Sequence, residues 1–200
     1  MVQPEHSSPS FGLVSGRPLF LDLMTDSYFL LEPKEEADLL AGIAAGGEQD
    51  DLTPVQRSRP SRGAADRSAD RPRSSPGDVF KIWRALRSVR RGLRARPLVT
   101  VIDSILERGA PGGGQAAICA ERLALQFAAA RRWLPHASNC LLDSLALLMF
   151  LKDHGAFADL VFGAKLDPFA AHCWLEAGDV LLNDRLERIE GFTPVGVVSP

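Results

Sequence analysis

The first 43 residues combine short apolar segments with one helical pattern. The apolar segments, separated by turn-forming residues, are 13–14, 19–23 and 28–31. Short apolar runs bounded by Gly, Pro, Asp and Ser are typical of strands. Pro33 and the acids after it suit the first turn of a helix that continues to Ile43. Residues 1–43 are therefore predicted to form a small β-rich module that ends in a helix.

Residues 44–77 have a different composition. Gly, Pro, Ser, Arg and Asp dominate this stretch, and aromatic residues are absent from it. Such a segment buries too little apolar surface to offset the entropy that its chain loses on folding. We therefore predict a flexible linker between residues 1–43 and a second domain at 78–200.

A basic amphipathic helix is predicted at residues 78–96. Apolar side chains recur there at helical spacing, and the remaining positions hold Lys81 and a series of arginines. Two interpretations stay open. Either the basic side faces solvent while the apolar stripe faces the core, or the basic side contacts an acidic peptide, a nucleotide or a partner protein. Further helices are predicted at 98–109 and 115–133.

The most apolar helix is predicted at residues 139–154. Leucines surround it almost completely, which indicates a buried central helix that ends at Gly155. Strand patterns follow in the rest of the chain, at 158–166, 171–176, 180–183 and 192–198. Helices followed by neighbouring strands predict an α+β fold class.

Composition narrows the range of functions. The chain has 200 residues and a formal net charge of −2, which does not favour nucleic-acid binding. No apolar run is long enough to span a membrane, and the polar N-terminus lacks the features of a signal peptide. The three cysteines include no CxxC pair, which argues against a disulfide framework and against a structural zinc site. We expect a cytoplasmic protein without a bound metal ion.

Cys140 begins the buried helix, and Ser138 or Asn139 suits the N-cap position before it. A helix N-terminus carries partial positive charge and unpaired N–H groups, which favour a thiolate over a thiol. The thiolate is the nucleophilic form of cysteine. The backbone N–H of Cys140 also suits the negative oxygen of a tetrahedral intermediate. Cys140 is therefore the predicted nucleophile.

The base for this nucleophile is predicted on a hairpin near the end of the chain. His172 lies in one strand, and a three-residue turn at 177–179 would place Asp184 opposite it on the returning strand. A carboxylate there can orient the imidazole and stabilise its charged form. A shift of one residue in register would bring Asn183 opposite instead. His136, on the loop before the buried helix, is an alternative base.

The other two cysteines are predicted to be structural. Cys119 lies in the middle of a predicted helix. Cys173 follows His172, so its side chain should point to the opposite face of the strand. A free cysteine in such a place usually packs as a small apolar side chain.

The sequence resembles a known family in four stretches: Asn139-Cys140-Leu141-Leu142-Asp143-Ser144-Leu145-Ala146-Leu147, Leu160-Val161-Phe162-Gly163-Ala164, Asp167-Pro168-Phe169-Ala170-Ala171-His172-Cys173-Trp174-Leu175-Glu176 and Asn183-Asp184. With these stretches, residues 80–200 resemble the lasso-peptide B proteins. Those are transglutaminase-like cysteine proteases that remove the leader from a lasso-peptide precursor. The resemblance implies a papain- or transglutaminase-like fold for this part of the chain. It also implies that Cys140, His172 and Asp184 are the catalytic residues.

The resemblance implies partners as well. Residues 11–42 are similar to the start of a leader-recognition module, to which the leader adds as an extra strand. The leader would then bind along Tyr28, Phe29, Leu30 and Leu31. The implied substrate is the precursor peptide, and the implied partner is an ATP-dependent, asparagine-synthetase-like cyclase. No cofactor is expected to bind this chain directly, so any dependence on ATP would come through the cyclase.

Two other functions stay open at this point. The same three residues could pass an acyl group to an amine, as in transglutaminases and arylamine acetyltransferases, because the thioester chemistry is identical. A scaffold without catalytic activity could also bind the precursor peptide and the cyclase. A Cys140→Ala substitution separates an enzyme from a scaffold, and the acyl acceptor separates the two enzymes.

Overall fold

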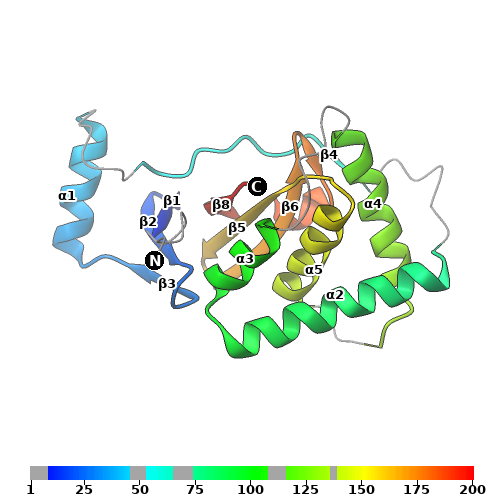
Figure 1. Cartoon of the computed structure of the whole chain (residues 1–200). Helices are drawn as coiled ribbons and strands as arrows, with labels where there is room; N and C mark the ends of the chain where they lie inside the picture. Colours follow the sequence, from blue (N-terminus) through cyan, green and yellow to red (C-terminus); the bar gives the residue numbers. More distant parts are fainter. Residues whose placement is uncertain (1–8, 46–52, 65–73, 108–115, 136–138) are drawn as a thin grey trace.

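The computed structural model in Figure 1 describes residues 9–45, 53–64, 74–107, 116–135 and 139–200. The helices in these ranges are α1 (Pro33–Ala44), α2 (Pro76–Ala95), α3 (Leu98–Leu106), α4 (Ala116–Arg131), α5 (Cys140–Asp153) and α6 (Leu186–Ile189). The strands are β1 (Ser10–Val14), β2 (Arg17–Asp22), β3 (Ser27–Leu30), β4 (Arg62–Gly63), β5 (Asp159–Leu166), β6 (Phe169–Ala177), β7 (Val180–Leu181) and β8 (Thr193–Val198). The combination of helices with largely antiparallel strands confirms the predicted α+β class.

The N-terminal strands form an antiparallel sheet in the order β1-β2-β3. A two-residue turn joins β1 to β2, and both of its residues, Ser15 and Gly16, have positive φ angles (52° and 81°). This backbone geometry matches the natural twist of a hairpin. Between β2 and β3, a carboxylate oxygen of Asp22 accepts a hydrogen bond from the backbone N–H of Met24 at 2.7 Å. The predicted three strands and helix of this region are confirmed.

One face of the N-terminal sheet packs directly on β8. Gly12 of β1 lies so close to this strand that a Cβ atom would overlap the backbone oxygen of Pro194. A Cβ atom at Gly196 of β8 would lie only 2.8 Å from the side chain of Leu21. Glycine at both positions permits the close approach of the two backbones. Val14, Leu19, Leu21 and Leu23 consequently belong to the same buried core as α5.

The second sheet has the strand order β4-β7-β6-β5-β8, and α5 packs against β6. Helices α2, α3 and α4 all contact α5, so they cover it on its other sides (Figure 1). The helix is buried from Ser144 through Lys152. This burial confirms the predicted central helix.

Helix α2 is the longest helix in the described residues, with 20 residues. Ser75 caps it, because its hydroxyl accepts a hydrogen bond from the N–H of Asp78 while that carboxylate accepts one from the N–H of Ser75. Ile82, Leu86 and Val89 are buried on its inner side, whereas its arginines are exposed. Neither this helix nor any other in the described ranges is long and apolar enough to cross a membrane.

Residues 53–64 differ from the predicted flexible linker. The backbone N–H of Val55 donates to the oxygen of Phe11 at 2.8 Å, and β4 pairs in parallel with β7. The guanidinium of Arg57 contacts both Asp159 and Glu176 at 2.5 Å. These contacts hold the segment against the second sheet, although its composition alone indicates a linker. Residues 46–52 and 65–73 lie outside the described residues, and the division into domains at 1–43, 44–77 and 78–200 stays a prediction.

Candidate active site

Cys140 is the first residue of α5 and is half-buried. Asn139 is the N-cap, because its side-chain oxygen accepts a hydrogen bond from the N–H of Leu142 at 3.0 Å. Cys140 is in the first turn, where backbone N–H groups have no acceptor within the helix. The structure therefore confirms that the candidate nucleophile lies at the start of a helix. Ser138, the other predicted cap, lies outside the described residues.

His172 lies on β6, and only 8% of its surface is exposed. Its Nε2 atom is hydrogen bonded to Oδ2 of Asp184, so Nδ1 is the ring nitrogen that remains for Cys140. The other carboxylate oxygen of Asp184 accepts a hydrogen bond from the backbone N–H of Arg185 at 2.8 Å. The rings of Trp174 and Phe192 pack beside the imidazole, with centroids 5.9 and 5.4 Å away. The imidazole is therefore fixed from several sides.

The turn that joins β6 to β7 is shorter than predicted. Ala177 pairs with Val180, so the loop has two residues instead of three, and Gly178 has a φ of +61°. Continued in this register, the ladder would bring Arg185 opposite His172. The chain instead leaves the ladder after Leu181 and bends, which returns Asp184 to the imidazole. The predicted register was wrong, although the predicted pair of side chains meets.

Asn183 holds this bend in place. Its side-chain oxygen accepts a hydrogen bond from the N–H of Leu175 at 2.8 Å, in place of a strand carbonyl. Its amide nitrogen donates to the hydroxyl of Ser144 at 2.8 Å, and that hydroxyl donates to the carbonyl of Cys173 at 3.3 Å. Asn183, predicted as a reserve partner for His172, thus connects α5 and β6 instead. Sequence reasoning missed Ser144, whose signal is a lone hydroxyl in an otherwise apolar, fully buried part of the helix.

The candidate site favours a thiolate and an imidazolium. Hydrogen bonds from the thiol of Cys173 and from His172 lower the pKa of Cys140 from 9.0 to about 4. Hydrogen bonds to Asp184 and to Cys140 raise the pKa of His172 from 6.5 to about 9. Burial opposes both shifts, because it disfavours charged groups. Between these two values the thiolate and the imidazolium coexist as an ion pair.

Cys173 contacts the sulfur of the candidate nucleophile. Its backbone N–H and its thiol both donate hydrogen bonds to the sulfur of Cys140, and the latter bond raises the pKa of Cys173 well above its usual value. Cys173 points to the opposite face of the strand from His172, as predicted, because it belongs to the core that contains α5, whereas His172 packs beside Trp174. The prediction missed that the thiol of Cys173 still reaches the sulfur of Cys140. The sulfur of Cys140 lies against the backbone of β6, where the side chains of two successive strand residues both reach it. Cys173 remains a protonated donor to the thiolate.

The four predicted leader-binding residues differ in their exposure to solvent. Tyr28 packs against Phe169, with ring centroids 5.8 Å apart, and burial together with the nearby charges of Asp26 and Cys140 raises its pKa. Phe29 and Leu30 are 39% and 37% exposed, and Leu31 is half-buried. Tyr28 therefore borders the candidate active site, whereas Phe29 and Leu30 lie on the accessible surface of the small sheet.

Two further predictions cannot be followed in the structure. His136, the alternative base, and the side chain of Cys119 lie outside the described residues. Within the described residues, no group of three His, Cys, Asp or Glu side chains is arranged to hold a metal ion.

Comparison with known proteins identifies the family. Residues 82–197, more than half of the chain, match the transglutaminase-like superfamily. The chain belongs to this superfamily. No curated protein and no solved structure shows significant similarity to the chain. The matched residues contain all of Cys140, His172 and Asp184, and membership indicates cysteine-nucleophile chemistry of the peptidase or acyl-transfer kind.

The transglutaminase-like site has the components that acyl chemistry at a cysteine requires. The thiolate of Cys140 can attack a carbonyl carbon, and the free N–H groups at the start of α5 can stabilise the oxygen that becomes negative. His172, charged at neutral pH and held by Asp184, can protonate the leaving amine. These components serve hydrolysis and acyl transfer equally, because the two reactions differ only in the second nucleophile.

The ion pair predicts how the reactivity of Cys140 changes with pH. Alkylation of Cys140 by iodoacetamide should be half-maximal near pH 4, because its pKa is lowered to about 4, and should stay nearly constant up to about pH 9. Peptide mapping by mass spectrometry measures the rate, and circular dichroism verifies the fold at each pH. Cys173 is an internal control, since its raised pKa keeps it unreactive over this range. A half-maximal rate near pH 9 would contradict the ion pair.

Proposed function

We propose that this chain is the leader peptidase of a lasso-peptide pathway. The arrangement of Cys140, His172 and Asp184 in a transglutaminase-like domain supports cleavage through a cysteine nucleophile. The resemblance of the stretches around Cys140 and His172 to lasso-peptide B proteins supports the choice of substrate. The position of the small N-terminal sheet, with Tyr28 beside Phe169, supports a substrate that contacts both parts of the chain.

In the first half of the reaction, the thiolate of Cys140 attacks the carbonyl carbon of the last leader residue. The carbonyl oxygen becomes negative and is stabilised by N–H groups at the start of α5. The imidazolium of His172 then gives its proton to the leaving nitrogen, the C–N bond breaks, and the core peptide departs with a free α-amine. The leader remains bound to Cys140 as a thioester.

In the second half, His172 is neutral and accepts a proton from a water molecule. That water attacks the thioester, the C–S bond breaks, and the leader leaves with a free carboxylate while the Cys140 thiolate and the imidazolium are restored. The free α-amine of the core is the group that a cyclase would join to a side-chain carboxylate. An ATP-dependent, asparagine-synthetase-like cyclase is therefore the proposed partner, and it would supply any ATP dependence.

Leader binding is proposed to extend the small sheet at β3, which lies at an edge of this sheet. The substitution Leu30→Asp should weaken binding of a fluorescently labelled leader peptide about tenfold, since it places a charge in the proposed contact. Fluorescence anisotropy measures the dissociation constant. Leu13→Asp is the matched control, because Leu13 has nearly the same exposure (36% against 37%) but lies on β1. Equal weakening by both substitutions would contradict binding at β3.

The function itself is tested with a synthetic peptide that carries a lasso-type leader and core. Full-length chain and peptide are incubated with and without the cyclase and ATP, and the products are identified by mass spectrometry. A peptidase yields a leader with a free carboxylate and a core with a free amine. Transfer of the leader to added glycine ethyl ester, in preference to water, would instead identify an acyl transferase. Binding without any product would leave the scaffold function and refute the peptidase.

A further inference from the structure

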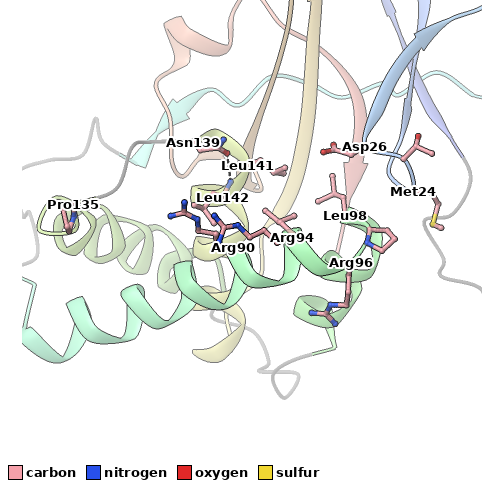
Figure 2. Close-up of a pocket in the computed structure, with 13 residues that line it drawn as sticks. Met24, Asp26, Arg90, Arg94, Arg96, Leu98, Pro135, Asn139, Leu141 and Leu142 are labelled. Atoms are coloured by element: carbon pink, nitrogen blue, oxygen red, sulfur yellow. Dashed lines mark hydrogen bonds between the residues drawn. The ribbon is translucent and has the colours of Figure 1, made fainter.

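A cleft of about 680 Å³ lies next to the start of α5. Its walls come from the β2–β3 turn, the end of α2, the beginning of α3 and the first turn of α5. The residues that line it include Asp26, Arg90, Leu93, Arg94, Leu98 and Leu141. In Figure 2, Arg90 and Arg94 project from α2 toward the start of α5, while Asp26 lies on the side of the β2–β3 turn. We call this cavity the arginine cleft.

The charge of the arginine cleft is unbalanced. Arg90, Arg94 and Arg96 are exposed, and no ion pair to any of them is found within the described part of the chain. Asp26 is the one carboxylate among the described lining residues. Arg90 and Arg94 are one helical turn apart on α2, so their like charges repel and a bound anion would lower the electrostatic free energy of this wall.

The arginine cleft adjoins the candidate active site. Asn139 and Leu141, which line it, are the neighbours of Cys140 on both sides in sequence. Asp26, on the opposite wall, lies close enough to Cys173 for its charge to affect that thiol. A peptide whose carbonyl carbon reaches the sulfur of Cys140 would therefore have residues within reach of this cavity.

We propose that the arginine cleft is a subsite for a carboxylate side chain, Asp or Glu, located within a few residues of the peptide bond that Cys140 attacks. The subsite rests on the proposed peptidase function for its role, but not for its ability to attract an anion. Guanidinium groups bind carboxylates through two parallel hydrogen bonds. Leu93, Leu98 and Leu141 provide apolar surface between the arginines and the turn, which suits a peptide segment better than a free polyanion.

Two alkylating agents test the attraction without any assumption about the substrate. Iodoacetate and iodoacetamide modify the same sulfur, but only iodoacetate carries a carboxylate. Changing Arg90 and Arg94 together to Gln should lower the ratio of the iodoacetate rate to the iodoacetamide rate at Cys140 about three- to tenfold. The rates are measured by mass spectrometry of the peptide that contains Cys140, at low ionic strength.

The matched control removes the same charge elsewhere. Arg84 of α2 and Arg122 of α4 are exposed and do not line the arginine cleft, so changing both to Gln should leave the ratio within about twofold of the original. An equal fall in both double variants would show a general charge effect and overturn the subsite, as would no fall in the first. If the first double variant is unfolded by circular dichroism, Arg90→Gln and Arg94→Gln are compared singly with Arg84→Gln.

A mixed pool of synthetic peptides then tests the role in substrate choice. Sequencing of the products should show Asp or Glu enriched near the cleaved bond, and the enrichment should disappear in the Arg90→Gln, Arg94→Gln variant. Cleavage without such enrichment would overturn the subsite while leaving the peptidase function intact. Absence of any cleavage, with the alkylation ratio behaving as expected, would refute the peptidase and retain the anion site. Protection of Cys140 from iodoacetate by ATP, but not by a Glu-containing peptide, would overturn the peptide assignment in favour of a nucleotide.

Discussion

Replacing Cys140 with alanine is expected to lower kcat/KM for peptide cleavage by at least about 10⁴-fold. The substitution removes the atom that forms the thioester, so the two-step reaction has no first intermediate. The fold should persist, because Cys140 is half-buried at the helix start and alanine is a favourable helix residue. Mass spectrometry measures the products, and thermal unfolding verifies the fold. Unchanged cleavage would contradict the assignment of Cys140 as the nucleophile.

Cys173→Ala provides the matched control for a second thiol in the same site. It leaves the nucleophile in place but removes the thiol that donates a hydrogen bond to Cys140. We expect a smaller loss of activity than for Cys140→Ala, together with a rise of the pKa of Cys140 above its value of about 4. The pH dependence of alkylation measures this change. An equally complete loss with no change in pKa would assign the chemistry to Cys173 instead.

The sequence predicts the helices and strands well where one local pattern decides them. Helix α5 is apolar on every side, and only a buried position suits such a helix. The same pattern places Cys140 at its start, where the free N–H groups are. For these elements, the local pattern of apolar and polar residues is enough to predict where the helix begins and that it is buried.

The geometry around Asp184 depends on interactions that no local pattern contains. Turn length decides the register of a hairpin, and a glycine at positive φ permits the shorter loop that forms here. The return of Asp184 to His172 then depends on Asn183, which bonds to β6 and to Ser144 of α5. The pairing of α5 with β6 becomes known only with the fold. The sequence therefore predicted the correct partner for His172, Asp184, from a turn length that was wrong.

Residues 53–64 illustrate the same limit in another way. Their composition is that of a linker, and a prediction from composition counts only what the segment itself can bury. The partners of Arg57 are Asp159 and Glu176, about a hundred residues later in the chain. Glu176 also lies deep in the protein, where 2% of it is exposed, and accepts a hydrogen bond from the indole of Trp174 at 2.6 Å. The buried carboxylate of Glu176 is therefore paired with an arginine from a segment whose composition is that of a linker.

This arrangement predicts a large effect for Arg57→Ala. We expect the free energy of unfolding to fall by about 3–5 kcal/mol, because the substitution leaves the carboxylate of Glu176 buried without its cation. Arg57 is itself only 21% exposed, so solvent cannot easily replace it. Equilibrium unfolding in urea, followed by tryptophan fluorescence, measures the change, and Trp174 reports on the same region.

Arg62→Ala is the matched control, since it removes the same side chain from the same segment. Arg62 pairs with Asp179 at 3.3 Å, but both side chains are largely exposed (46% and 59%), and such pairs contribute little to stability. A large effect at Arg57 with a small one at Arg62 would mean that residues 53–64 stabilise β6, the strand that also holds His172. Equal, small effects would mean that the segment merely lies on the sheet. Because Arg57 bonds Glu176, which lies four residues beyond His172 on β6, loss of this contact should also loosen the imidazole and slow alkylation of Cys140 at neutral pH.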